Sequence, residues 1–316
     1  MMSLTDFLPG YLGLEATGEL ENRIEKAAGL LRECTLCPRE CRVNRLNDER
    51  GFCKTGARVQ VSSCGPHFGE EPELVGRSGS GTIFISHCNL ACEFCQNYKI
   101  SQCGDGKEVS AGDLADMMLS LQRQGCHNIN IVTPSHVVPQ VLESLGIAAA
   151  RGLHIPLVYN SGGYDSVETL KLLDGVVDIY MPDAKYGRDE VALALSHAPH
   201  YVASMKAALR EMHRQVGDLV VEQGIAVRGM IIRHLVLPGD LADSGIVMQF
   251  IADEISRDSY VNIMAQYRWP TSISPPEFIK NDPNYRALLR PTTAEEYRFA
   301  IRYAKEAGLH RGFSDR

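Results

Sequence analysis

The stretch GTIFISHCNLACEFCQNY, residues 81–98, joins a short apolar run to three cysteines in the spacing C-x3-C-x2-C. Structural zinc closes a tetrahedron of four Cys or His ligands, so three thiols do not complete such a site. Thiolates also hold iron–sulfur clusters, and four cysteines complete a 4Fe–4S cluster. With Cys88, Cys92 and Cys95 alone, one iron stays open to a substrate or cofactor, whereas Cys103 or Cys126 would close it. A zinc knuckle with Cys103 as fourth ligand is the alternative, although knuckles favour C-x2-C pairs.

The composition is that of a globular protein. The chain has 316 residues, of which 44% are hydrophobic, enough for one large domain with a small appendage. It has no apolar run near the ~18–20 residues that span a bilayer and no secretory pattern at its N-terminus, which predicts a cytoplasmic protein. Ten cysteines in that compartment predict metal binding, redox chemistry or burial rather than disulfides. The net charge of −7 argues against a nucleic-acid surface.

Short aliphatic runs alternate with helical patterns from residue 81 onward. The predicted strands are 82–86, 129–133, 156–160, 177–181, 228–237 and 260–265. The predicted helices are 111–124, 137–151, 167–173, 189–223 (as two helices), 241–256 and 293–307. This alternation predicts parallel βαβ units in a doubly wound sheet or a barrel, with the active site at the carboxyl ends of the strands. The three cysteines directly follow the first strand and therefore lie where chemistry is expected.

The motif in this setting resembles the signature of the radical S-adenosylmethionine (radical SAM) superfamily. CNLACEFCQN is similar to the pyruvate formate-lyase activating enzymes, and GPHFGEEPELVG (65–76) and MAQYRWP (264–270) are similar to one branch of their relatives. The likeness covers nearly the whole chain. It implies an α/β fold, a partial (β/α)6 barrel of parallel strands with a Cys-rich, mostly irregular N-terminal extension. The extension would be residues 1–76 and the radical SAM core residues 77–316.

The resemblance also implies a mechanism. Cys88, Cys92 and Cys95 would bind three irons of a 4Fe–4S cluster, and the amino and carboxylate groups of SAM would chelate the fourth. Reduction of the cluster would cleave SAM to methionine and a 5′-deoxyadenosyl radical, which abstracts hydrogen from the substrate. No catalytic side chain beyond the cluster ligands is implied. Phe94 matches the aromatic position that lies against adenine in the family, and ordinary packing under the loop is its alternative role.

Polar residues end three of the other strands, and SAM needs polar partners there. YNSGGY (159–164) offers Asn160, Ser161 and two glycines that permit close backbone approach. MPDAKY (181–186) offers Asp183 and Lys185, which alternate along a strand and so share a face. A D-x-K element lies there in activating enzymes, and a solvated ion pair is the alternative. Arg233, flanked by apolar residues, needs an anionic partner, and the SAM carboxylate would serve.

One element departs from the family. Many members carry G-G-E after the second strand, where the backbone and the Glu hold the methionine amine, but this chain has IVTPSH (131–136). Thr133 and Ser135 are polar, yet no carboxylate is present, so the partner of the amine is undecided. His234, within the fifth strand, is predicted to be a hydrogen-bonded core histidine rather than a ligand.

A second cysteine group lies upstream, in CTLCPREC and GFC. Cys34, Cys37, Cys41 and Cys53 have the spacing C-x2-C-x3-C-x11-C on a segment that could hardly fold alone, which predicts a second metal site. Zinc and an auxiliary 4Fe–4S cluster both fit, and scattered buried cysteines are the alternative. Residues 32–58 hold seven Arg or Lys against four Asp or Glu. This excess predicts a solvated face or a docking patch for an acidic electron donor.

The sequence thus predicts a radical SAM enzyme that activates a partner protein by forming a glycyl radical. Its electron donor would be a flavodoxin or ferredoxin, and neither a membrane nor a nucleic acid is an expected partner. Modification of another peptide, a small molecule or a nucleotide is the second hypothesis. A metal-bound structural or electron-transfer protein is the third.

Overall fold

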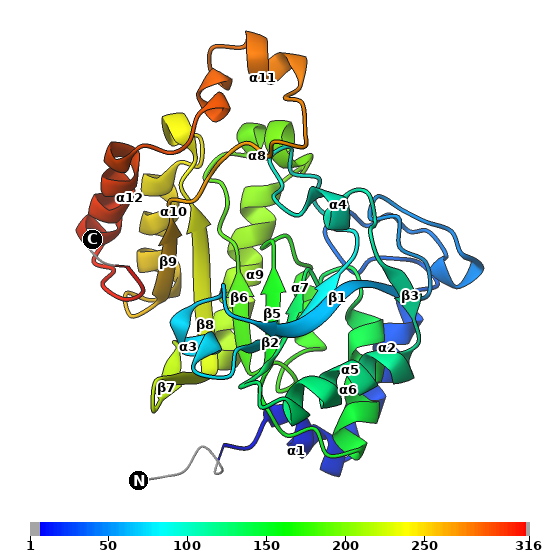
Figure 1. The fold of residues 1–316 in the computed structure, drawn as a ribbon. Coiled ribbons are helices and arrows are strands. Elements are labelled where there is room, and N and C mark those ends of the chain that lie inside the picture. Colours follow the sequence, from blue (N-terminus) through cyan, green and yellow to red (C-terminus); the bar gives the residue numbers. More distant parts are fainter. Residues whose placement is uncertain (1–6, 314–316) are drawn as a thin grey trace.

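A computed structural model describes residues 7–313, whose strands form one continuous sheet (Figure 1). The order of the strands across it is β3-β1-β2-β4-β5-β6-β8-β7, and β9 also pairs with β8. The strands β2, β4, β5, β6, β8 and β9 are mutually parallel. They span Ser80–Ile85, Ile129–Val132, Leu157–Ser161, Ile179–Pro182, Ile225–Leu235 and Tyr260–Met264. Each predicted strand is present within a few residues, and the predicted partial six-stranded parallel barrel is confirmed.

Three further strands, in antiparallel pairs at the two edges of this set, were not predicted. They are β1 (Val59–His67), β3 (Lys107–Val109) and β7 (Val220–Glu222). The prediction of helix through residue 223 is therefore wrong at its end, because the helix stops before Gly217, where φ is +71°. All of β7 is solvent-exposed, so its sequence lacks the apolar alternation that signals a strand.

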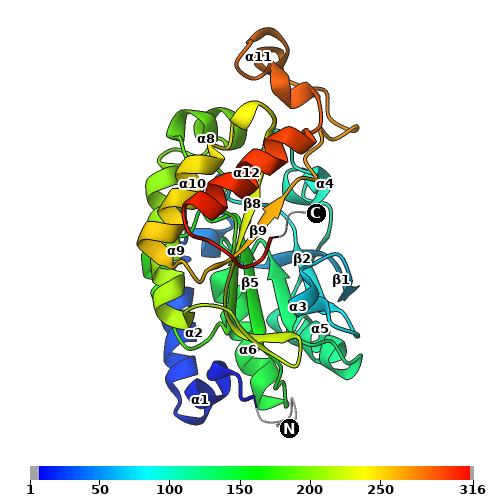
Figure 2. The same cartoon turned by 90° about the vertical axis from the view of Figure 1, so that its left-hand side faces the viewer.

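Helices cover the outside of the strands, as the βαβ pattern predicts. Figure 2 shows α9 and α10 on one side of the strands and β1 and α3 on the other. The helices are α1 (Gly10–Ala16), α2 (Glu19–Gly29), α3 (Pro72–Val75), α4 (Tyr98–Ser101), α5 (Ala111–Arg123), α6 (Val138–Ala150), α7 (Val167–Lys171), α8 (Asp189–Ser196), α9 (Tyr201–Val216), α10 (Ser244–Phe250), α11 (Glu277–Asn281) and α12 (Ala294–Glu306). The short turns are η2 (Arg45–Asn47), η3 (Pro238–Asp240), η4 (Ile251–Ile255) and η5 (Arg286–Leu289). The main core lies between these helices and the sheet.

The predicted extension packs against the barrel at three places. Helices α1 and α2 contact α6, and the backbone N–H of Gly10 donates to Asp178 at 2.9 Å. The Cys-rich segment between α2 and β1 is irregular except for η2, and Arg45 in that turn is 1% exposed. Strand β1 joins the sheet beside β2. The boundary between residues 76 and 77 stays a prediction.

Within residues 7–313, the helices are all too short or too polar to cross a bilayer.

Candidate active site

A cavity of about 370 Å³ lies at the carboxyl ends of the parallel strands. The edge of a parallel sheet collects the residues that follow successive strands, which explains why distant sequence segments meet there. The predicted residues that line this cavity are Cys88, Cys92, Cys95, Thr133, Asn160, Ser161, Asp183, Lys185 and Arg233. The structure therefore brings together in one space all the predicted core-site residues except Phe94 and Ser135.

Each of the three cysteine sulfurs has a hydrogen-bonding neighbour. The Cys88 sulfur accepts from the backbone N–H two residues later at 3.3 Å, and the Cys92 sulfur accepts from the Ser196 hydroxyl at 2.9 Å. The sulfur of Cys95 lies 3.2 Å from the hydroxyl of Ser101. Burial raises the pKa of Cys92 to about 11, although the charge of the nearby Lys185 opposes the rise. These donors favour the thiolate form that binds metal, so the loop suits iron ligation.

Neither proposed fourth ligand lies in the cavity. Cys103 is exposed, and Cys126 is buried at the other end of the parallel strands, where its thiol lies 4.0 Å from the carbonyl of Ser78 before β2. Among residues 7–313, no three Cys, His, Asp or Glu side chains are arranged to hold a single metal ion. The described site offers three thiols, the number that leaves one iron of a 4Fe–4S cluster open.

The NSGGY turn after β5 is built by close backbone contacts. The Ser161 hydroxyl donates to Asp165 at 2.6 Å and accepts from the backbone N–H of Gly163. A Cβ on Gly163, where φ is +73°, would lie 2.0 Å from the carbonyl oxygen of Asp183. Glycine is therefore required there, as the sequence predicts, because the turn presses against β6.

Asp183 and Lys185 form an ion pair inside the cavity. Their side chains are 23% and 20% exposed, so the pair is neither fully solvated nor fully buried. Burial by itself would lower the pKa of Lys185, but the charge and hydrogen bond of Asp183, together with the neighbouring Cys92 and Tyr201, raise that pKa. The two charges cancel at this side of the cavity.

Arg233 has anionic partners from within the chain. Its guanidinium lies 3.3 Å from Glu70 and 3.1 Å from Glu71, whose side chains are 6% and 2% exposed. Glu71 also accepts from Asn262 at 2.7 Å. The chain itself supplies the anionic partner that the arginine was predicted to need, because the loop before β2 folds over the end of β8. That Arg233 binds SAM stays a prediction.

Sequence reasoning missed Glu70 as a site residue. Glu70 and His67 line the cavity, although they precede the first predicted strand of the barrel. One carboxylate oxygen of Glu70 is buried without a hydrogen bond. Burial raises the pKa of Glu70, and the nearby Arg233 opposes the rise. In the sequence, Glu70 lies in the motif GPHFGEEPELVG, whose family resemblance does not indicate a site residue.

Phe94 and Ser135 are buried outside the cavity lining. The ring of Phe94 is 7% exposed and packs edge-on against Tyr267, with centroids 5.5 Å apart. A contact of Phe94 with adenine stays a prediction. Of the polar residues in IVTPSH, only Thr133 faces the cavity, and its φ of +65° is a strained value for a β-branched residue.

His234 is the core histidine that the sequence predicts. It is fully buried, and its ring nitrogens lie 2.7 Å from the carbonyl of Ala184 and 2.9 Å from the hydroxyl of Ser244. Burial lowers its pKa to about 4, so the ring is neutral at pH 7.

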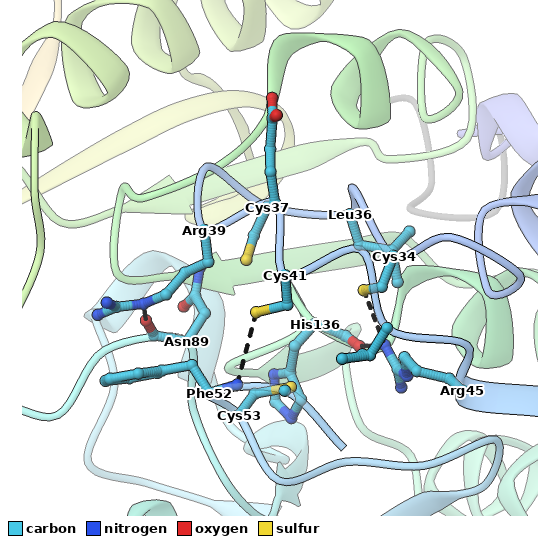
Figure 3. Close-up of a pocket in the computed structure, with 13 residues that line it drawn as sticks. Cys34, Leu36, Cys37, Arg39, Cys41, Arg45, Phe52, Cys53, Asn89 and His136 are labelled. Atoms are coloured by element: carbon cyan, nitrogen blue, oxygen red, sulfur yellow. Dashed lines mark hydrogen bonds between the residues drawn. The ribbon is translucent and has the colours of Figure 1, made fainter. Parts of the chain in front are cut away.

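The upstream cysteines share a second pocket beside this cavity. Cys34, Cys37, Cys41 and Cys53 line it together with Arg45, Asn89 and His136 (Figure 3). One loop thus gathers all four around one pocket, and the second metal site stays a prediction.

A partial parallel barrel with three cysteines after its first parallel strand, beside a polar cavity, defines an iron–sulfur enzyme of the SAM-cleaving type. The radical SAM superfamily profile matches residues 82–251, more than half of the chain. The chain therefore belongs to the radical SAM superfamily. This membership implies a 4Fe–4S cluster and SAM as cofactors, and the donor set described above fits both.

Two archaeal relatives resemble the chain over most of its length. The uncharacterised protein MJ0674 of Methanocaldococcus jannaschii is 32% identical over 298 residues, covering 92% of this chain and 79% of that protein. The uncharacterised protein MJ0808 of the same organism is 23% identical over 299 residues, covering 87% of this chain and 78% of that protein.

Two solved structures are more distant. HydG, a maturase of the [FeFe]-hydrogenase, has a TM-score of 0.47 at 10% identity, covering 72% of this chain and 49% of HydG. TYW1 with a lysine–pyruvate adduct has a TM-score of 0.39 at 10% identity, covering 58% of this chain and 63% of TYW1. The chain thus spans about half of HydG and less than two thirds of TYW1. Membership in the superfamily rests on the profile match.

Proposed function

We propose that this radical SAM enzyme acts on a partner protein, forming a glycyl radical in it. One observation supports the radical chemistry. The three cysteines line the same cavity as the polar residues at the ends of four parallel strands. Bound there, the cluster and SAM would supply a 5′-deoxyadenosyl radical. The chain's own residues would hold SAM and keep water from the reacting atoms.

Glu70 is the group we propose for the SAM amine. The element IVTPSH provides no carboxylate at the position where many family members hold that amine. Glu70 brings a buried carboxylate to the same cavity from the loop before β2, and its oxygen 3.3 Å from Arg233 makes no hydrogen bond. Glu71 pairs with Arg233 and accepts from Asn262 outside the cavity lining, so Glu70 is the acid that faces the cavity.

The variant Glu70→Gln tests this role. Losing a charge-assisted hydrogen bond of ~1.5–3 kcal/mol should weaken SAM binding by about 10- to 150-fold. Titration calorimetry of the cluster-loaded protein measures it, and Glu108→Gln is the control because Glu108 lies on the exposed strand β3. Unchanged affinity in Glu70→Gln would rule out the assignment.

The glycyl-radical role is supported by the motif CNLACEFCQN and by an exposed apolar rim. Phe68 is 63% exposed and lies between His67 and Gly69, both of which line the cavity. An exposed aromatic ring beside an active site suits a peptide segment. We further propose a cytoplasmic location, because all ten cysteines are free thiols in the described structure.

Two measurements test the proposed function in sequence. Anaerobic protein reduced with dithionite should convert SAM to 5′-deoxyadenosine, and absence of this product would refute the radical chemistry. Co-incubation with a glycyl-radical enzyme should then give a protein radical in the electron paramagnetic resonance (EPR) spectrum. If SAM is cleaved and no such partner acquires a radical, the second hypothesis, another peptide or small molecule, replaces the first.

A further inference from the structure

We infer that Cys34, Cys37, Cys41 and Cys53 hold a second 4Fe–4S cluster, which passes single electrons to the cluster at Cys88 through Asn89. This inference rests on the proposed radical SAM function. It adds a second cluster, an electron path between the two clusters and an electron-transfer role for the upstream cysteines, none of which membership in the superfamily implies.

The first observation is the convergence of four thiols from one irregular loop. All four line the same pocket, where Cys34 and Cys37 are each 8% exposed. Backbone hydrogen bonds fold the loop back on itself, since the N–H of Cys34 donates to Val43 and the N–H of Arg42 donates to Cys34. A segment with so little regular structure gains its fold from a metal centre, as small metal-bound domains do.

The second observation is that polar donors face these sulfurs. Arg45, 1% exposed, places one guanidinium nitrogen 4.0 Å from the sulfur of Cys34 and anchors the loop to the carbonyl of His136 at 2.7 Å. The backbone N–H of Phe52 lies 3.5 Å from the sulfur of Cys41. Amides and cations around cysteine sulfurs stabilise the negative charge of a thiolate-bound centre.

The third observation is the chemistry of the neighbouring site. A zinc ion is redox-silent, whereas an iron–sulfur cluster beside Cys88 would be able to pass an electron to it. The four upstream cysteines share one pocket, and four is the number of thiolates that complete a 4Fe–4S cluster.

The fourth observation is that one side chain touches both cysteine sets. Asn89 lines the second pocket and is 1% exposed. It shares that pocket with Cys37, and its side-chain oxygen lies 3.9 Å from the sulfur of Cys88, its neighbour in the chain. Arg39 donates to the Asn89 carbonyl at 2.8 Å, and its charge is attracted to Cys37, Cys41 and Cys88. The two sites are therefore separated by a single residue.

The second site has an exposed edge. Phe52 lines the pocket and is 40% exposed, with the guanidinium of Arg39 3.4 Å from its ring centroid. A one-electron donor of the flavodoxin or ferredoxin class would reduce this cluster, and the cluster would reduce its neighbour at Cys88. One electron leaves the donor and one arrives at the Cys88 cluster, with no bond or proton changed in between.

The experiment compares the wild type with Cys41→Ala and with the control Cys64→Ala. Cys41 is only partly buried, and Cys64 is an exposed thiol outside both pockets. Anaerobically purified wild type and control should contain about eight irons and no zinc, and Cys41→Ala about four. Stoichiometric zinc with four irons in the wild type would overturn the inference. If Cys41→Ala does not fold, the wild-type metal analysis and Cys53→Ala still decide it.

EPR spectra test the neighbour relation without any turnover. Fully reduced wild type should show two magnetically interacting clusters, whereas Cys41→Ala should show one isolated signal that still changes when SAM binds. Two non-interacting signals in the wild type would exclude the path through Asn89. Reduction of the Cys88 cluster by a flavodoxin-class donor, followed by freeze-quench EPR, should be at least tenfold slower in Cys41→Ala. Equal rates would refute the relay.

Dithionite separates this inference from the proposed function. It reduces the Cys88 cluster directly, so Cys41→Ala should still form 5′-deoxyadenosine with it. Failure of the wild type to cleave SAM with dithionite refutes the proposed function, whereas the iron count and the EPR spectra decide the second cluster independently.

Discussion

Replacing Arg233 by Met should destabilise the fold, because it removes the cation from two buried acids. Arg233 lies 3.3 Å from Glu70 and 3.1 Å from Glu71, and all three side chains are at most 18% exposed. Surface ion pairs contribute ~0–1 kcal/mol, but removal of one partner from a buried pair costs ~3–5 kcal/mol. We therefore expect Arg233→Met to lower the free energy of unfolding by about 3–5 kcal/mol at pH 8.

Denaturant unfolding followed by circular dichroism measures this loss, with Arg302→Met as the control. Arg302 pairs with Glu306 on α12, where the side chains are 56% and 65% exposed, so its loss should cost less than ~0.5 kcal/mol. Restoring the charge balance in Arg233→Met/Glu71→Gln should recover part of the stability.

The stability lost in Arg233→Met should depend on pH in one direction. Burial already raises the pKa of Glu70, and Arg233 opposes that rise. Without the arginine, the pKa of Glu70 in the folded state moves further above its unfolded value. The folded state then favours the protonated acid, so stability is lost as pH rises through the folded pKa. The deficit of Arg233→Met should shrink between pH 8 and pH 5. A loss below ~1 kcal/mol, accompanied by a large drop in SAM affinity, would refute this reasoning and assign Arg233 to SAM.

Three further predictions follow from the site and the fold. Cys88→Ala should lose the cluster of the first site and all 5′-deoxyadenosine formation, and retained product would contradict the ligand assignment. Gly163→Ala should reduce stability by several kcal/mol in thermal unfolding, because its Cβ meets the Asp183 carbonyl, whereas Gly13→Ala, with open space around it in α1, should be neutral or stabilising. His234 has a pKa lowered to about 4, so acid should destabilise the fold as pH falls from 6.5 toward 4, by roughly 3 kcal/mol in total. In His234→Gln the pH dependence of unfolding over that range should flatten, and an unchanged slope would assign it to other groups.

The sequence by itself determined the parallel core and the grouping of the cysteines. Strands such as β5 are buried on both faces, and they alternate with helices along the chain. This alternation is a local sequence pattern, and it predicts the parallel topology. Cys88, Cys92 and Cys95 are close in the chain, so their spacing alone specified the first site. The four upstream cysteines are likewise grouped in sequence, and their sharing of a pocket was predictable for that reason.

Only the tertiary structure decided how distant segments meet. Strands β1 and β7 are held by pairing with β2 and β8, so their own sequences carry little strand signal. Glu70 reaches Arg233 across more than 160 residues, and Asn89 lies against Cys37 from another segment. Such contacts depend on how loops pack at the end of the sheet, where backbone direction and burial, rather than residue spacing, select the partners.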